Sequence, residues 1–156
     1  MPRVTVSVEL RWADVDLNGH VNNVAYLVLL EEVRIRALHP VIRAASGVPG
    51  PLAATGRATV VVGRHEIEYL RQLTWWPAPV RVELWVARIG TASVDVHHAI
   101  LPPAGAGEEP YAHAATTLVY LDPATQRSRP LTGAERQAFE PLLDAPLAFR
   151  RAPVPT

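Results

Sequence analysis

Residues 24–38 read VAYLVLLEEVRIRAL, a stretch of helical length that contains neither glycine nor proline. Apolar side chains nearly encircle its first two turns, and charged residues enter only in its second half. Because a helix that is apolar on all sides is a buried helix, this segment predicts a central helix that other elements must cover. Asn22 or Asn23 is suited to cap its beginning, and His39-Pro40 predicts its end.

Alternating apolar and polar residues predict strands on both sides of this helix. Before it, residues 4–12 alternate, with valine, leucine or tryptophan at the even positions. After it, residues 40–56 form a loop-like stretch rich in glycine and proline. Four runs of strand character follow: Arg57–Leu70, Pro79–Ile89, Ser93–Leu101 and Tyr111–Leu121. A short helix is expected between Leu131 and Leu143, with Thr132 and Glu135 as its capping box.

The order of these elements predicts an α+β roll, in which one curled antiparallel five-stranded sheet surrounds a long central helix. One sheet cannot cover such a helix on every side, and its edge strands would stay open. We therefore expect a homodimer or homotetramer in which a second copy joins sheet edges and covers the helix. Residues 1–150 are expected to form one domain, and residues 151–156 a disordered tail.

Composition and charge narrow the class of protein. The 15 basic and 15 acidic residues give no net charge, which argues against a nucleic-acid partner. The chain has no cysteine, so disulfides, thiolate metal ligands and a cysteine nucleophile are excluded together. Residues 1–12 lack the apolar segment of a signal peptide, and the apolar run at residues 24–30 is too short to span a bilayer. We expect a cytoplasmic protein without a membrane partner.

The polar loop at residues 14–23, DVDLNGHVNN, opens like a calcium-binding loop. Such a loop needs a glutamate at its twelfth position, where this chain has Ala25, and helices on both sides. The histidines also lack the H-E-x-x-H spacing of a zinc site, so no metal is expected. A tight turn and a catalytic loop remain as interpretations. The richness in acid, amide and imidazole beside a helix N-terminus favours the catalytic loop.

The run RWADVDLNGHVNNVAYLVLLEEVRIRAL, residues 11–38, resembles the signature segment of the hotdog-fold acyl thioesterases. These comprise the 4-hydroxybenzoyl-CoA thioesterase-like proteins and the fatty acyl-ACP thioesterases. Residues 60–93 resemble the second half of bacterial members, and the resemblance spans about residues 3–121. It implies the hotdog fold, which is the sheet-around-helix roll inferred above. It also implies a cofactor-free hydrolase of fatty acid metabolism that cleaves acyl-CoA to free acid and CoA.

The resemblance also implies roles for four residues of the polar loop. Asp16 falls at the position of the catalytic carboxylate, which acts as general base or as nucleophile through a mixed anhydride. Asn18 and His20 match residues that position water and the carboxylate in the acyl-ACP branch. The backbone N–H near Asn23 matches the donor to the thioester carbonyl, the oxyanion site.

Three further residues match the family, but the resemblance gives them no definite role. We interpret Tyr26 as a packing residue, and also keep it as a candidate substrate contact. Arg64 is a second candidate contact, to the pantetheine phosphates of the substrate, or a residue that only flanks a strand edge. Asp14 is interpreted as a hydrogen-bonding residue of the loop. The acyl-ACP branch adds a downstream Glu and Cys pair that this chain lacks, so the expected chemistry depends on Asp16.

Two other functions stay open at the level of sequence. One is a hotdog enoyl-CoA hydratase or dehydratase, although its Asp/His or His/Glu motif is not found. The other is a non-catalytic protein that binds acyl-CoA or fatty acid. The absence of net charge and of lysine favours acyl-CoA over acyl-carrier protein as substrate. The acyl chain length is not predicted.

Overall fold

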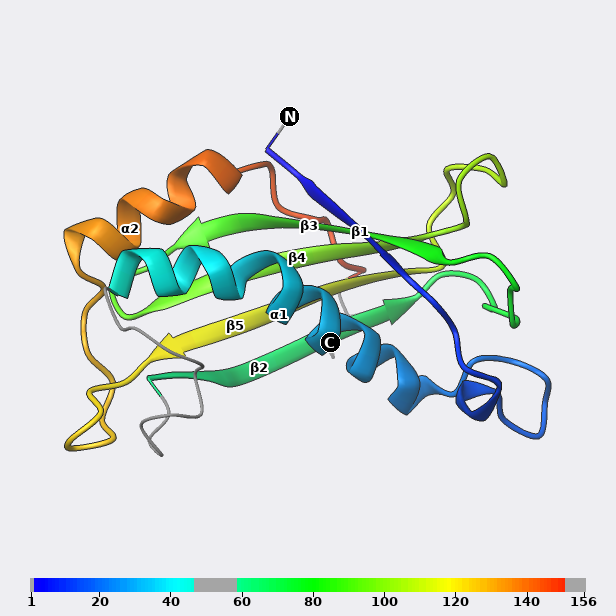
Figure 1. Cartoon of the computed structure of the whole chain (residues 1–156), viewed down its shortest axis with the longest axis horizontal. Coiled ribbons are helices and arrows are strands. Elements are labelled where there is room, and N and C mark those ends of the chain that lie inside the picture. Colours follow the sequence, from blue (N-terminus) through cyan, green and yellow to red (C-terminus); the bar gives the residue numbers. More distant parts are fainter. Residues whose placement is uncertain (1, 47–58, 151–156) are drawn as a thin grey trace, which may run out of the picture.

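A computed structural model describes residues 2–46 and 59–150 of the chain. Five antiparallel strands form one sheet in the order β1-β3-β4-β5-β2, and the long helix α1 lies across one face of it (Figure 1). The fold class predicted from the sequence pattern is confirmed. The expected tail at residues 151–156 and most of the expected loop at residues 40–56 lie outside the described residues.

The strands and helices follow one another in the order that the sequence predicts, with some shifts at their ends. Ser93–Leu101 forms β4 with the predicted bounds, because Gly90 and Pro102 flank it. The alternation through residue 12 overestimates the first strand, since Trp12–Asp14 form a turn of 3-10 helix. The remaining elements are β1 (Val4–Val8), α1 (Asn23–Ser46), β2 (Val60–Tyr69), β3 (Val80–Ile89), β5 (Ala112–Tyr120), α2 (Gly133–Phe139) and a 3-10 helix at Glu140–Leu142.

Helix α1 continues past Pro40, so the prediction that His39-Pro40 ends it is wrong. A proline inside a helix removes one hydrogen bond and crowds the carbonyl four residues earlier. Here Leu38 is fully buried, and Val41 and Ile42 pack against the core. Full burial of a side chain such as Leu38 is worth about 1.5–3 kcal/mol, and the partial burial of Val41 and Ile42 adds to it, which offsets the loss at the proline.

Only the sheet-facing side of α1 is buried within one chain. Tyr26, Leu29, Leu30, Val33 and Leu38 belong to the hydrophobic core. The opposite side exposes large apolar residues to solvent, namely Val24, Leu27, Val28 and Ile35. This agrees with the expectation that one sheet cannot cover such a helix on every side.

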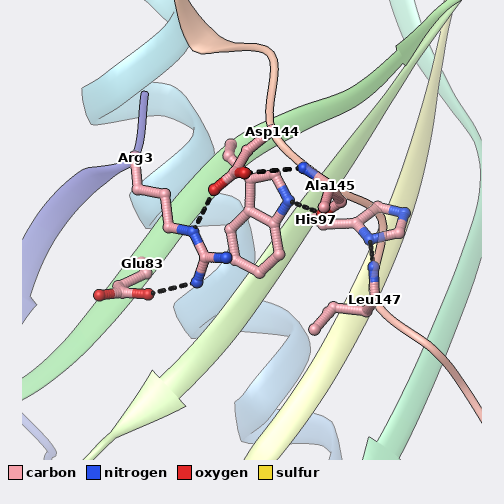
Figure 2. A network of polar contacts seen from close by, with 7 residues as sticks. Arg3, Glu83, His97, Asp144, Ala145 and Leu147 are labelled. Carbon is pink, nitrogen blue, oxygen red and sulfur yellow. Dashed lines mark hydrogen bonds and ion pairs between the residues drawn. The ribbon is translucent and has the colours of Figure 1, made fainter. Parts of the chain in front are cut away.

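The C-terminal segment, residues 145–150, lies on the outer face of the sheet, opposite α1, after Leu143 and Asp144 have paired with Val86 of β3. The indole N–H of Trp85 donates to the Ala145 carbonyl at 2.9 Å, and the Leu147 N–H donates to His97 Nδ1 at 3.0 Å (Figure 2). Further along, the Arg150 N–H donates to a carboxylate oxygen of Glu68 on β2 at 2.8 Å. The segment thus crosses from β3 to β2.

Arg3 fixes the start of the chain to the same outer face. Its guanidinium donates to Asp144 at 2.6 Å and to Glu83 at 3.0 Å, and lies 4.1 Å above the Trp85 ring (Figure 2). These contacts occupy the outer face with structural interactions. Substrate chemistry is therefore expected on the α1 side.

Candidate active site

The polar loop is anchored by Asp14. This buried carboxylate accepts hydrogen bonds from the Arg11 N–H at 2.8 Å and from the Arg11 guanidinium at 2.7 Å. Burial alone would raise the pKa of Asp14, but the hydrogen bonds from Arg11 lower it below its ordinary value. The Asp14 carbonyl also accepts from the Asn22 N–H at 2.7 Å, which closes the loop. These contacts agree with the interpretation of Asp14 as a structural residue.

Asp16 is held inside this loop by the backbone. Its Oδ1 accepts from the N–H groups of Asn18 at 2.8 Å and His20 at 3.3 Å. Its own N–H donates to the His20 carbonyl at 2.8 Å, and Gly19 supplies the positive φ of 78° that the turn needs. The second oxygen, Oδ2, has no hydrogen-bond partner among the described residues. The carboxylate is thus fixed in position with one oxygen available.

The beginning of α1 supplies a free donor beside this carboxylate. Asn22 caps the helix, because its Oδ1 accepts from the Val24 N–H at 2.9 Å. The N–H of Asn23, the first helical residue, finds no acceptor within the described part of the chain. A helix N-terminus carries a partial positive charge and unsatisfied N–H groups. The Asn23 N–H is therefore suited to bind a carbonyl oxygen that gains negative charge.

An open pocket of about 340 Å³ brings these groups together. Asp16, His20, Asn23 and Tyr26 line it from the loop and the start of α1. The end of β2 and the residues after it form the other wall: Tyr69, Leu70, Arg71, Gln72 and Leu73. The Tyr69 hydroxyl donates to the Asn23 carbonyl at 3.3 Å, so strand and helix meet directly at this pocket. Four of the six candidate site residues thus lie together.

Asn18 and Arg64 are not brought to this pocket. The Asn18 side chain is exposed on the loop, and only its backbone N–H contacts Asp16. Arg64 is exposed on β2 and forms an ion pair with Glu66 at 2.7 Å. Within one chain, neither side chain is placed to touch a substrate at Asp16.

Tyr26 is a buried wall of the pocket. Its ring packs edge-on against Tyr69 with the ring centres 5.0 Å apart. Burial raises the pKa of Tyr26 to about 12, so its hydroxyl stays protonated at neutral pH. Tyr26 is therefore a packing residue, in agreement with its interpretation from the sequence. It also lines the pocket in which a substrate would bind.

Arg71 is a pocket residue that the sequence analysis did not identify. Its guanidinium lies 4.5 Å from the centre of the Tyr111 ring and donates to the Glu109 carbonyl. The Glu109 carboxylate is 3.7 Å away. Nothing in the local sequence distinguishes this arginine from the others. Only the fold, which places the end of β2 against the polar loop, makes it part of the site.

Within residues 2–46 and 59–150, no group of three or more histidine and carboxylate side chains is placed to hold a metal ion. None of the helices in this part of the chain combines the length and the apolar composition that a membrane span requires.

The family follows from comparison with known proteins. The model of the thioesterase-like superfamily matches residues 10–156, nearly the whole chain. The chain belongs to the thioesterase-like superfamily. No curated protein sequence matches this chain.

Solved structures of the same fold support this membership. A candidate acyl-CoA thioesterase from Xanthomonas campestris is 37% identical, with a TM-score of 0.63, and the match covers 81% of this chain and 97% of that one. A thioesterase from Thermus thermophilus, complexed with coenzyme A and zinc, is 28% identical with a TM-score of 0.70 and coverages of 90% and 94%. A predicted thioesterase from Bacillus stearothermophilus is 23% identical with a TM-score of 0.76, over 92% and 98%, which shows the shared fold.

Proposed function

We propose that this superfamily member hydrolyses acyl-CoA thioesters to a free acid and CoA at the pocket formed by the polar loop and the start of α1. The observation that carries the proposal is the placement of a carboxylate with one unoccupied oxygen, on Asp16, in the same pocket as the unpaired N–H of Asn23. The neighbour from Xanthomonas campestris is a candidate acyl-CoA thioesterase, and the one from Thermus thermophilus is complexed with coenzyme A. Both support acyl-CoA as the substrate class.

The proposed reaction needs two groups and a water molecule. The Asn23 N–H binds the thioester oxygen and stabilises the negative charge that forms when the carbonyl carbon is attacked. Asp16 takes a proton from the attacking water, whose oxygen bonds to the carbonyl carbon. The carbon–sulfur bond then breaks, and the protonated Asp16 returns the proton to the sulfur, which leaves as the CoA thiol. General-base catalysis is worth about 10²–10⁴-fold, and one oxyanion donor about 10²–10³-fold. In the alternative route, Asp16 attacks the carbonyl carbon itself, the carbon–sulfur bond breaks and CoA leaves as the thiolate; water then hydrolyses the anhydride and supplies the proton for the thiolate.

His20 contributes to the proposed reaction mainly by holding other groups in place. Its backbone N–H and carbonyl both bond to Asp16, and the residue lines the pocket. We propose that it orients the carboxylate and the attacking water. Arg71 at the pocket rim is the cation placed to bind the phosphates of CoA, since Arg64 lies outside the pocket.

The test is thiol release from short, medium, long and aromatic acyl-CoAs by the wild type and Asp16→Asn. Asparagine keeps the Oδ1 acceptor that holds the loop, but it cannot accept a proton. We expect kcat to fall about 10²–10⁴-fold. Asp122→Asn is a matched control, because Asp122 Oδ1 also accepts from backbone N–H groups of its own turn, at 3.0 and 2.7 Å.

Two outcomes of this experiment would contradict the proposal. Full activity in Asp16→Asn would move the chemistry away from this pocket. Saturable acyl-CoA binding without thiol release in the wild type would replace hydrolysis by the function of a binding protein.

A further inference from the structure

A second, smaller pocket of about 150 Å³ lies toward the other end of α1. Its walls are mostly apolar and include Ile35, Leu38 and Ile42 from α1, and Val60 and Val62 from β2. The same two elements flank the candidate active site, where Asn23 and Tyr69 meet. The two pockets therefore lie at opposite ends of the α1–β2 pair.

Arg34 brings an unsatisfied positive charge into this second pocket. Only 12% of its side chain is exposed, and its Nη1 is buried without a hydrogen-bond partner among the described residues. The other terminal nitrogen, Nη2, is 4.0 Å from the carboxylate of Glu31, which is 62% exposed and so largely solvated. Burial lowers the pKa of Arg34, but a guanidinium stays charged in proteins. An unpaired buried donor of this kind is costly unless a ligand satisfies it.

The titratable sheet side chains that interact with Arg34 are two histidines, His98 and His65. His98 on β4 is completely buried; burial, and then the charge of Arg34, lower its pKa to about 3, so it is neutral. Burial also lowers the pKa of His65, whose Nδ1 is 3.0 Å from the Thr116 hydroxyl. Residues 47–58, GVPGPLAATGRA, contain no aspartate or glutamate and cannot supply a carboxylate. Within the described residues, Glu31 is the carboxylate paired with Arg34, and this pair leaves Nη1 without a hydrogen-bond partner.

We propose that Arg34 binds the terminal carboxylate of an acyl chain whose thioester lies at Asp16 and Asn23, so that mono-CoA thioesters of dicarboxylic acids are preferred substrates. The inference rests on the proposed hydrolase function and names its substrate class. Along α1, Asn23 and Arg34 are about 16 Å apart, because a helix rises 1.5 Å per residue. At about 1.2 Å per extended single bond, this distance fits a chain of roughly twelve to fourteen carbons. Leu27, four residues after Asn23 and seven before Arg34, exposes apolar surface between the two ends for the methylene groups of the chain.

The test compares three CoA thioesters of equal chain length: dodecanoyl, 12-hydroxydodecanoyl and the mono-thioester of dodecanedioic acid. For the wild type, kcat/KM should be highest for the dicarboxylic substrate. Arg34→Met should lower that value by about 10- to 100-fold, the usual loss for a hydrogen bond to a charged group, and leave dodecanoyl-CoA within a few-fold. Arg34→Lys should restore part of the preference. Arg36→Met is the matched control, because Arg36 is exposed on the same helix and pairs with Glu32.

Two results would overturn the proposal. An unchanged ratio of kcat/KM values in Arg34→Met would mean that water alone satisfies this arginine. An equal loss on all three substrates, together with a changed oligomeric state, would mean that Arg34 binds a carboxylate of a second copy of the chain.

Failure of the proposed function would look different, since the wild type would then hydrolyse none of the three substrates. In that case, calorimetric titration with free dodecanedioate and dodecanoate still tests the pocket. Tighter binding of the dicarboxylate, lost in Arg34→Met, supports the site, and equal binding of both acids overturns it.

Discussion

At the scale of single residues, His98 makes the fold sensitive to acid. Burial lowers its pKa from 6.5 to about 3, so the folded protein holds it neutral while the unfolded chain protonates it below pH 6.5. The unfolded state then binds more protons, and stability falls as the pH falls from 6.5 toward 3. We expect the free energy of unfolding, measured in urea between pH 7 and 5, to drop by up to about 1.4 kcal/mol per pH unit.

The variant His98→Leu tests the assignment of this pH dependence. It removes the titrating group and also the two ring nitrogens that lack hydrogen-bond partners among the described residues. The slope should become shallower without vanishing, because burial also lowers the pKa values of His65, His97 and His113. A slope identical to that of the wild type would place the acid sensitivity elsewhere.

Single residues also differ in whether the sequence can predict that they belong to the site. Asp16, His20 and Asn23 are close in the chain, and a tight loop ending at a helix N-terminus must hold them near one another. Arg64 and Arg71 belong to a distant segment. Their positions depend on how β2 pairs with β5 and where it ends against the polar loop, which a local pattern does not encode. The sequence therefore singled out Arg64 and missed Arg71, although only Arg71 lines the pocket.

At the scale of elements, sequence pattern determines the type of each segment better than its ends. The predicted helix stop failed because the rule for proline is local, whereas the burial of Leu38 and the packing of Val41 and Ile42 come from the sheet. Pro40→Ala should restore the missing N–H to the Arg36 carbonyl and relieve ring crowding. We expect the protein to gain about 1–2 kcal/mol in free energy of unfolding, since greater freedom of the unfolded chain offsets part of the benefit.

A second proline supplies the control for this measurement. Pro141 lies in the first turn of the 3-10 helix at Glu140–Leu142, where a missing N–H has no partner to lose. Pro141→Ala should therefore change the free energy of unfolding by less than Pro40→Ala and without a gain. Equal stabilisation by both substitutions would contradict the explanation that Pro40 costs stability because it lies inside a helix.

At the scale of the whole molecule, two surfaces of the described chain are left uncovered. The solvent side of α1 exposes Val24, Leu27, Val28 and Ile35, and β2 is an edge strand hydrogen-bonded only to β5 within the described sheet. The opposite edge, β1, has five residues against ten in β2, and short edge strands are less prone to pairing. A second copy that pairs along β2 and covers α1 would satisfy both surfaces. We therefore expect sedimentation equilibrium to show a dimer or a dimer of dimers.

A charge placed on the apolar side of α1 tests this arrangement. Val28 is 43% exposed, so Val28→Glu should leave the chain folded but place a carboxylate inside the proposed interface, where its desolvation weakens association. We expect the dimer dissociation constant to rise by at least about tenfold, because a buried unpaired charge costs several kcal/mol. Leu143→Glu is the matched control, since Leu143 is 42% exposed but lies beside Val86 of β3 and is not part of the exposed side of α1. If Leu143→Glu dissociates the protein and Val28→Glu does not, the interface lies beside the end of β3 instead.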